Sequence, residues 1–260
     1  MRLGVGLLGC TLLFQLFCAG AVRAAEVRVS AAASMAEALR EIAAAYTQMS
    51  PAEVVIANFG ASGALARQIE QGAPADLYLS ANAQWVEYLI AAGRIAGEDV
   101  RTLAGNSLVF VGRSGLEVTT LADLSALGRI ALVNPRSAPA GEYAQQALDA
   151  VGVYAALAGK LVMAQDVRQA VVYADRGEVD GALVYKSDAL LARQAVILHE
   201  VPAHLHNEIS YPAALTTSGR NNPNAVAFFN FLQSDTARRI LHSYGFIVEE
   251  EVLPQMTKDQ

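Results

Sequence analysis

Four short segments, three of them made of small residues, carry the chemistry that this sequence offers. Each follows an apolar run typical of a strand and precedes a helical pattern; they are Ala33-Ser34, Gly60-Ala61-Ser62-Gly63, Pro139-Ala140-Gly141 and Asp166-Val167. The first amide groups of a helix have no intrahelical acceptor and carry a partial positive charge, so they favour anions. Small residues let a ligand approach the backbone. The pattern predicts an anion site made of N–H and O–H donors.

Three hydroxyl groups that could donate to an anion also have structural explanations. With Glu37 three positions later, Ser34 matches a capping box, and taken alone this favours helix capping over ligand binding. The same alternative holds for Ser62, less strongly because its segment is rich in glycine. Tyr185, at the end of the apolar run 182–185, is either a core aromatic or a hydroxyl donor at the carboxyl end of a strand. The pattern of this one sequence does not separate the two.

Other chemistries find less support in the sequence. A hydrolase nucleophile elbow needs Gly-x-Ser-x-Gly, but the fifth residue of the motif that begins at Gly60 is Ala64. All four histidines lie in the last quarter of the chain, far in sequence from either serine, so a catalytic triad is not indicated. His204-x-His206 could bind a metal, although a polar surface loop is the simpler interpretation. Neither a Walker phosphate loop nor Gly-x-Gly-x-x-Gly is present.

Strand and helix patterns alternate along the chain and must position these segments. Apolar strand-like runs are followed by helical periodicity, which predicts α/β sheets covered by helices. We expect strands near 27–31, 54–56, 76–79, 108–111, 130–133, 161–163, 182–185 and 213–215, and helices near 35–46, 62–72, 83–93, 140–151, 166–177, 224–232 and 235–244.

Composition and the amino-terminal segment indicate an exported protein. Arg2 precedes an almost wholly apolar stretch that ends in Val22-Arg23-Ala24, so residues 1–24 are expected to be a signal peptide cleaved after Ala24. A membrane anchor, or a lipid anchor at Cys10, is a less favoured alternative. Both cysteines lie in this segment, so the mature chain can form no disulfide. It carries 17 basic against 25 acidic side chains and no basic run, so nucleic acid is not an expected partner.

Taken together, the motifs resemble those of the periplasmic molybdate-binding proteins of ABC importers. The matching segments occur in order over nearly the whole mature chain, at residues 31–34, 59–63, 65–69, 72–77, 105–109, 139–144, 165–168, 184–189 and 244–246. The resemblance implies a two-lobed periplasmic binding protein of type II, in which each lobe is a mostly parallel sheet flanked by helices and the ligand lies in the cleft. It divides the chain into residues 25–107 with 212–260 and residues 108–211.

The resemblance also implies a function and a set of ligand contacts. The protein would capture molybdate, and tungstate of nearly the same size, for an inner-membrane ABC permease and its ATPase. It would act in the periplasm as a monomer, without enzymatic activity, cofactor or directly bound metal cation. The contacts carried over are Ser34 and Ser62 from the first lobe, and Ala140, Val167 and Tyr185 from the second.

Three other functions remain open at the level of sequence. A receptor for sulfate or another small oxyanion on the same fold is the main alternative. A secreted hydrolase using Ser62 or Ser34 lacks a paired base. The ligand-sensing half of a transcription regulator is disfavoured by the signal peptide and by the absence of a DNA-reading helix-turn-helix pattern. A site made only of donors would disfavour phosphate, because a protonated anion brings a hydroxyl that finds no acceptor.

Overall fold

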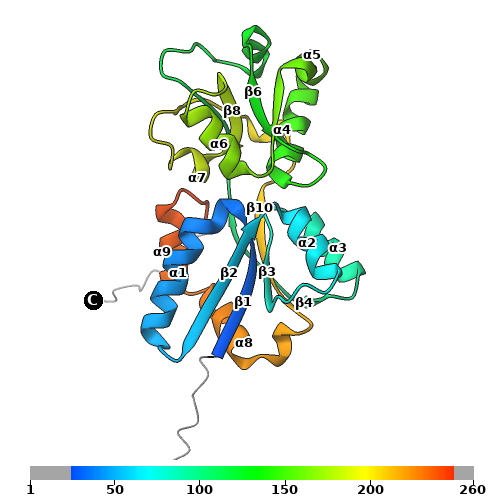
Figure 1. The fold of residues 1–260 in the computed structure, drawn as a ribbon, viewed down its shortest axis with the longest axis vertical. Coiled ribbons are helices and arrows are strands. Elements are labelled where there is room, and N and C mark those ends of the chain that lie inside the picture. The colour runs from blue at the N-terminus through cyan, green and yellow to red at the C-terminus, as the bar shows by residue number, and fades with distance from the viewer. Residues whose placement is uncertain (1–24, 249–260) are drawn as a thin grey trace, which may run out of the picture.

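Two α/β lobes stacked along the long axis make up the protein (Figure 1). The computed structural model describes residues 25–248, so the predicted signal peptide lies outside the described residues. Among these residues, every helix is too short or too polar to cross a membrane.

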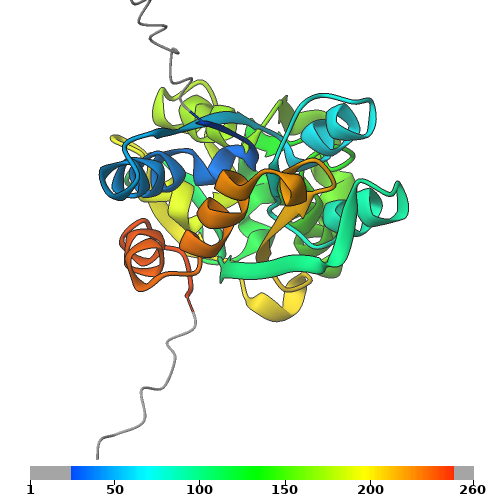
Figure 2. The ribbon, with the colours of Figure 1, turned by 90° about the horizontal axis from the view of Figure 1, so that it is seen from below.

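The first lobe is built on a sheet with strand order β2-β1-β3-β10-β4. Its strands are β1 (Ala25–Ala32), β2 (Glu53–Gly60), β3 (Leu77–Leu79), β4 (Ile95–Gly105) and β10 (Ser210–Thr216). The helices are α1 (Ala36–Met49), α2 (Ser62–Glu70), α3 (Gln84–Ala91), α8 (Pro223–Phe231) and α9 (Asp235–Ser243). Seen from below, α1 and α9 lie on one side of this lobe and α2 and α3 on the other (Figure 2).

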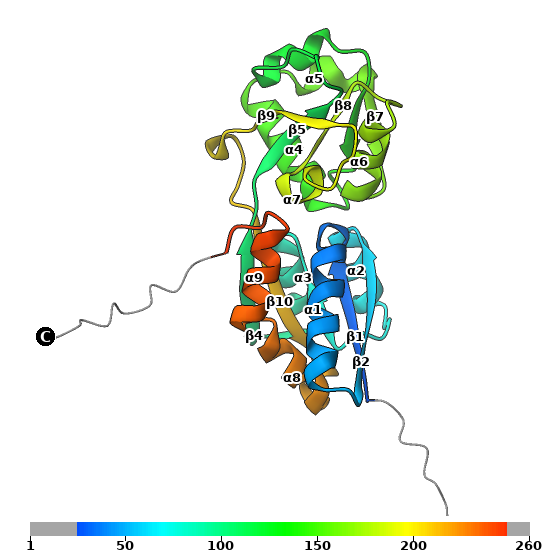
Figure 3. The same cartoon turned by 90° about the vertical axis from the view of Figure 1, so that its left-hand side faces the viewer.

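The second lobe has the strand order β7-β6-β8-β5-β9. Its strands are β5 (Leu108–Gly112), β6 (Ile130–Val133), β7 (Leu161–Ala164), β8 (Gly181–Tyr185) and β9 (Val196–Glu200). Its α-helices are α4 (Pro139–Ala150), α5 (Tyr154–Leu157), α6 (Val167–Asp175) and α7 (Lys186–Ala189). Short 3-10 turns cover 33–35 in the first lobe and 121–126, 158–160 and 203–205 in the second, and a further one covers 219–221. Figure 3 shows this lobe above the first.

The α/β fold predicted from sequence is confirmed, but the sheets are mixed rather than mostly parallel. In each sheet two strand pairings are parallel and two are antiparallel. The antiparallel partners include β4 and β9, which the sequence did not predict. β9 is exposed or half-buried along its length, and most of β4 is as well, so neither has the continuous apolar run of a buried strand. By contrast, every residue of β3, β5, β6 and β8 is buried.

Candidate functional site

A small pocket lies between the two lobes, at the carboxyl ends of β1, β2, β6, β7 and β8. The space that the centre of a water molecule can reach in it is about 20 Å³. Drug-sized ligands occupy pockets of about 300 to 1,000 Å³. Its lining consists of Ala32, Ala33, Ser34, Gly60, Ala61, Ser62, Ala81, Ala138, Pro139, Ala140, Asp166, Val167 and Tyr185. The dimensions suit a small ion better than a metabolite.

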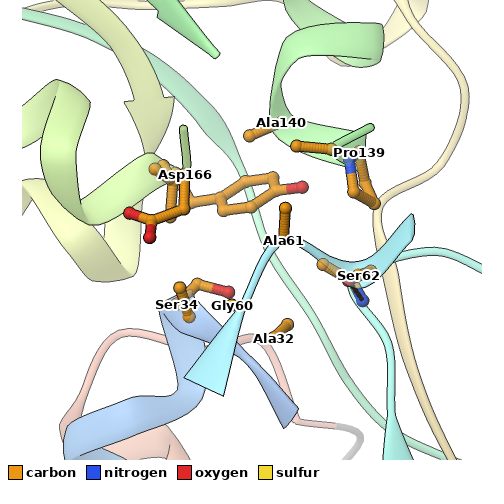
Figure 4. Close-up of a pocket in the computed structure, with 13 residues that line it drawn as sticks. Ala32, Ser34, Gly60, Ala61, Ser62, Pro139, Ala140 and Asp166 are labelled. Carbon is orange, nitrogen blue, oxygen red and sulfur yellow. Dashed lines mark hydrogen bonds between the residues drawn. The ribbon is translucent and has the colours of Figure 1, made fainter. Parts of the chain in front are cut away.

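All five residues predicted to contact a ligand line this one pocket: Ser34, Ser62, Ala140, Val167 and Tyr185. Figure 4 shows Ser34 and Ser62 in the segments of the first lobe, with Ala140 and Pro139 across the pocket. The structure thus brings together residues that are up to 151 positions apart in the chain, counted from Ser34 to Tyr185. None of the five lies elsewhere.

Three helices start at the pocket wall. Ser62 is the first residue of α2, Val167 is the first of α6, and Ala140 is the second of α4. Amides in these positions have no acceptor within their own helix, and Pro139 at the start of α4 has no amide hydrogen to contribute. The free donors and the partial positive charge of each helix start are therefore directed to the same small volume.

Close packing explains why glycine stands at the start of α4. A Cβ added to Gly141 would lie 2.1 Å from the carbonyl oxygen of Val133, the last residue of β6. Only a residue without a side chain lets the helix begin this close to the end of the strand. The contact fixes the first turn of α4, and with it the amide of Ala140, against the sheet.

Ser34 does not cap α1, contrary to the interpretation that the sequence alone favoured. It lies inside the 3-10 turn 33–35, and helix α1 begins with no side-chain cap. Its Oγ instead accepts a hydrogen bond of 3.0 Å from the hydroxyl of Tyr211. The Glu37 carboxylate pairs with Arg40 and with Arg168, so the reciprocal half of the capping box is also missing.

Ser62 is likewise held by a donor from its own lobe. Its Oγ accepts the backbone N–H of Ala81 at 3.1 Å, and the preceding residue, Ala61, makes no side-chain cap for α2. Since the serine oxygen is used as an acceptor, its own hydrogen remains available to another group. Both serines are nearly inaccessible, at 4% for Ser34 and 1% for Ser62.

Tyr185 supplies a buried donor that has no partner among the described residues. The side chain is 1% exposed, and its Oη makes no hydrogen bond. Burial raises the pKa of this hydroxyl well above its ordinary value, with Tyr211 and Tyr143 adding to the shift. The group therefore keeps its proton and can donate it. An unsatisfied buried polar atom costs about 1 to 3 kcal/mol, which a ligand acceptor in the pocket would recover.

The pocket contains no basic side chain, although one lies just behind its wall. Asp166 lines the pocket, but its Oδ1 caps α6 by accepting the amide of Gln169 at 3.0 Å. Arg168, the second residue of α6, donates through Nε to the carbonyl oxygen of Ala33 at 3.3 Å. The same Nε lies 2.9 Å from Oδ1 of the fully buried Asp188. Because the N–H is directed at Ala33, the contact with Asp188 is Coulombic and both Asp188 oxygens lack a donor.

Several contacts join the lobes around the pocket. The amide of Gly63 donates to the carbonyl oxygen of Ser137 at 3.1 Å. On the same side, Nδ2 of Asn82 donates to Glu142 at 3.3 Å. Arg168 contributes on the opposite side through the carbonyl of Ala33 and an ion pair with Glu37. The first and second lobes thus meet directly on both sides of the pocket.

The environment of the two serines does not support nucleophilic catalysis. Their oxygens accept from Tyr211 and from a backbone amide, and among the described residues neither hydroxyl is hydrogen-bonded to a base that could remove its proton. His206, considered above as a metal ligand, has Nδ1 2.7 Å from the carbonyl oxygen of Asn207. Residues 25–248 contain no cluster of three or more His, Cys, Asp or Glu side chains that could hold a metal ion.

Sequence reasoning missed the residues that lie outside the pocket and contact the residues that line it. Tyr211 and the Ala81 amide hold the two serines, while Arg168 and Asp188 lie behind the start of α6. Arg168 and Asp188 lie inside the matched segments 165–168 and 184–189. The sequence comparison therefore marked their positions but assigned them no function. Tyr211 lay outside every motif, and nothing in its neighbourhood connects it to Ser34.

A family model assigns the chain to a class. The model is described as "Bacterial extracellular solute-binding protein" and matches residues 27–247. The chain belongs to this family of bacterial extracellular solute-binding proteins. Molybdate-binding protein ModA of Escherichia coli is 35% identical to it over 86% of this chain and 90% of the relative.

Solved structures show the same fold. The periplasmic molybdate-binding protein of Azotobacter vinelandii superimposes with a TM-score of 0.79 at 24% identity, over 86% of this chain and 100% of that one. The sulfate-binding protein SubI of Mycobacterium tuberculosis gives a TM-score of 0.75 at 19% identity, over 87% of this chain and 88% of that one. Because both identities are low, these structures establish the two-lobed architecture of a solute-binding protein and leave the ligand open.

Proposed function

We propose that this solute-binding protein captures molybdate, and also tungstate, between its two lobes. The observation that carries the proposal is the unpartnered, buried hydroxyl of Tyr185 in a pocket that three helix starts also face. The 35% identity to the Escherichia coli molybdate-binding protein supports the choice of ligand. Ser34, Ser62, Ala140, Val167 and Tyr185 are the proposed contacts, through hydroxyls and backbone amides.

A dianion can be held here although the chain is acidic. Fixed N–H and O–H dipoles that converge on a charge form charge-assisted hydrogen bonds, worth roughly 1.5 to 3 kcal/mol each. Five such contacts replace the hydration of the anion without a counter-cation. Since the donors come from both lobes, full affinity requires both lobes to face the same anion.

The alternative ligand is sulfate, because a sulfate-binding protein shares the fold. Both anions are tetrahedral and doubly charged, so only the longer metal–oxygen bonds of molybdate separate them. Titration calorimetry on the protein without its first 24 residues, using molybdate, tungstate, sulfate and phosphate, tests the choice. We expect heats from molybdate and tungstate, and little from sulfate or phosphate. Comparable heats from sulfate would reassign the ligand.

Replacing Tyr185 by phenylalanine tests the hydroxyl contact alone. Loss of one hydrogen bond to a charged ligand should weaken molybdate binding by roughly 10- to 100-fold. Without molybdate the variant should be at least as stable as the wild type, because it removes an unsatisfied buried hydroxyl. The matched control is Tyr46→Phe, a buried tyrosine of α1 that contacts Glu53 and lies outside the pocket. Unchanged affinity in Tyr185→Phe would assign this residue to the core.

The remaining parts of the proposal concern transport. We infer that residues 1–24 direct export to the periplasm, that the protein acts as a monomer, and that it delivers its ligand to an ABC permease with its ATPase. Membership of an extracellular solute-binding family supports export and delivery. Within this proposal the protein is a receptor, not an enzyme, and uses no cofactor.

A further inference from the structure

A chain of hydrogen bonds runs to Ser34 from the segments that connect the lobes. Asn106 lies between β4 of the first lobe and β5 of the second, and Tyr211 is the second residue of β10. Both are buried, at 7% and 0% exposure. Nδ2 of Asn106 donates to the Tyr211 hydroxyl at 3.4 Å, and that hydroxyl donates to Ser34 Oγ at 3.0 Å. Neither Asn106 nor Tyr211 lines the pocket.

The direction of this chain is set by a backbone amide. The N–H of Ser107 can only donate, and it lies 2.9 Å from Oδ1 of Asn106, so the carbonyl side of the amide must face it. The NH₂ group of Asn106 then points to Ser187 Oγ at 2.8 Å and to Tyr211. An NH₂ group cannot accept, so the Tyr211 oxygen receives a hydrogen bond and its own hydrogen goes to Ser34.

Burial keeps that hydrogen in place. It raises the pKa of Tyr211 well above the ordinary value, and the nearby Asp188 adds to the shift. Edge-on ring contacts with Tyr185, at 5.8 Å between centroids, and with Phe246, at 5.1 Å, hold the aromatic ring. Tyr211 is therefore a fixed donor to Ser34.

The consequence concerns the hydrogen of Ser34. With one lone pair of its Oγ occupied by the Tyr211 hydroxyl, Ser34 must point its own hydrogen away from Tyr211, and the residue lines the pocket. We propose that Asn106 and Tyr211 are positioning residues that hold Ser34 as a donor, so that the pocket rejects oxyanions that carry a proton. This inference rests on the proposed oxyanion function and assigns its selectivity against hydrogen phosphate to a relay outside the pocket. Ser62 is held in the same sense by the Ala81 amide.

Tyr211→Phe tests the relay with almost no change in volume. Without the tyrosine hydroxyl, Ser34 can rotate and offer a lone pair to the hydroxyl of a protonated anion. We expect molybdate affinity to fall about tenfold, the equivalent of one hydrogen bond. We also expect hydrogen phosphate to compete better, so that the molybdate-to-phosphate selectivity ratio falls by more than the molybdate affinity itself. Competition calorimetry at pH 8, where hydrogen phosphate is the main species, measures both quantities.

A double-mutant cycle shows whether Tyr211 acts through Ser34. If it does, Tyr211→Phe in a Ser34→Ala background should change neither molybdate affinity nor selectivity further. Tyr46→Phe is the matched control and should behave as the wild type in both measurements. Additive losses in the cycle, or an unchanged selectivity ratio in Tyr211→Phe, would overturn the relay. Failure of the wild type to bind molybdate would instead refute the proposed function.

Asn106→Asp provides a second variant of nearly the same shape. A carboxylate only accepts, so it should draw the Tyr211 hydrogen and turn the hydrogen of Ser34 away from the pocket. Molybdate affinity should fall further than in Tyr211→Phe. The same substitution in the Tyr211→Phe background measures the effect of the added charge alone, and an equal loss in both backgrounds would contradict the relay.

Discussion

Gly63→Ala is expected to abolish tight binding of molybdate while leaving both lobes folded. Gly63 is the second residue of α2, and its amide donates to Ser137 across the pocket. An added Cβ would lie 2.8 Å from the carbonyl oxygen of Ser137 and 2.3 Å from the Trp85 ring. The methyl group would therefore meet Ser137 of the second lobe, which opposes closure, and also the Trp85 ring of its own lobe.

The expected loss of molybdate affinity follows from the ligand contacts that are missing when the cleft stays open. The contacts proposed for the second lobe come from Ala140, Val167 and Tyr185, each worth roughly 1.5 to 3 kcal/mol to a charged ligand. Their loss together weakens binding by at least about 1,000-fold. Within the first lobe, alanine is favoured over glycine in a helix by about 1 kcal/mol. The half-buried Trp85 ring must shift to admit the methyl group, and this gain offsets part of that cost, so the unliganded variant should remain folded.

Two measurements and two further variants make this test specific. Calorimetry gives the affinity, and small-angle X-ray scattering shows whether molybdate still contracts the protein. Gly97→Ala, where an added Cβ has no atom within 4 Å, should leave both unchanged. Gly63→Ala combined with Trp85→Leu removes the contact with the ring and keeps that with Ser137. Restored binding in this double variant would show that Trp85, rather than closure, was responsible.

Asp188→Asn is expected to stabilise the unliganded protein at pH 7.5 but not at pH 4.5. Asp188 is fully buried in α7, and burial raises the pKa of its carboxyl from 3.8 to about 7, against the lowering effect of Arg168 and with a small contribution from Asp166. Between these values the folded state binds a proton that the unfolded state has released. Stability therefore decreases as the pH rises from about 4 to about 7.

The expected difference in the free energy of unfolding is large because the pKa of Asp188 is much higher in the folded state than in the unfolded state. At about 1.36 kcal/mol per pKa unit, the wild type should lose on the order of 4 kcal/mol relative to Asp188→Asn across this range. Urea unfolding of both proteins at several pH values measures the difference and cancels the titration of other groups. A difference that stays constant with pH would mean that Arg168 keeps Asp188 ionised throughout.

Asp175 provides a control of opposite sign. Amides of Gln194, Ala195 and Arg193 donate to its carboxylate and hold its pKa below the usual value. Its contribution to stability is thus present above the unfolded pKa and is lost as the pH falls through the lower, folded value. The free energy of unfolding of the wild type relative to Asp175→Asn should therefore increase with rising pH. The same quantity relative to Asp188→Asn should decrease.

The sequence predicted the buried strands well, including β5, which is antiparallel to both neighbours, and it missed the more exposed strands β4 and β9. Strand β6 was expected at 130–133 and spans Ile130–Val133, because a strand covered on both faces is a continuous apolar run. Strand β4 alternates irregularly between exposed and buried residues, and β9 has no fully buried residue. Their pairing with β10 and β5 depends on backbone hydrogen bonds to distant strands, and these leave little trace in side-chain pattern.

The five candidate ligand contacts came from the resemblance to molybdate-binding proteins, whereas the sequence by itself determined the alternation of strands and helices and the helix starts that favour an anion. Such features are local, because a few neighbouring residues decide where a helix begins. Only the tertiary structure decided that Ser34 is not a helix cap, since its partner, Tyr211, lies 177 positions away. Whether a hydroxyl group acts as donor or acceptor depends on which groups lie next to it in space. Residue spacing along the chain does not determine those neighbours.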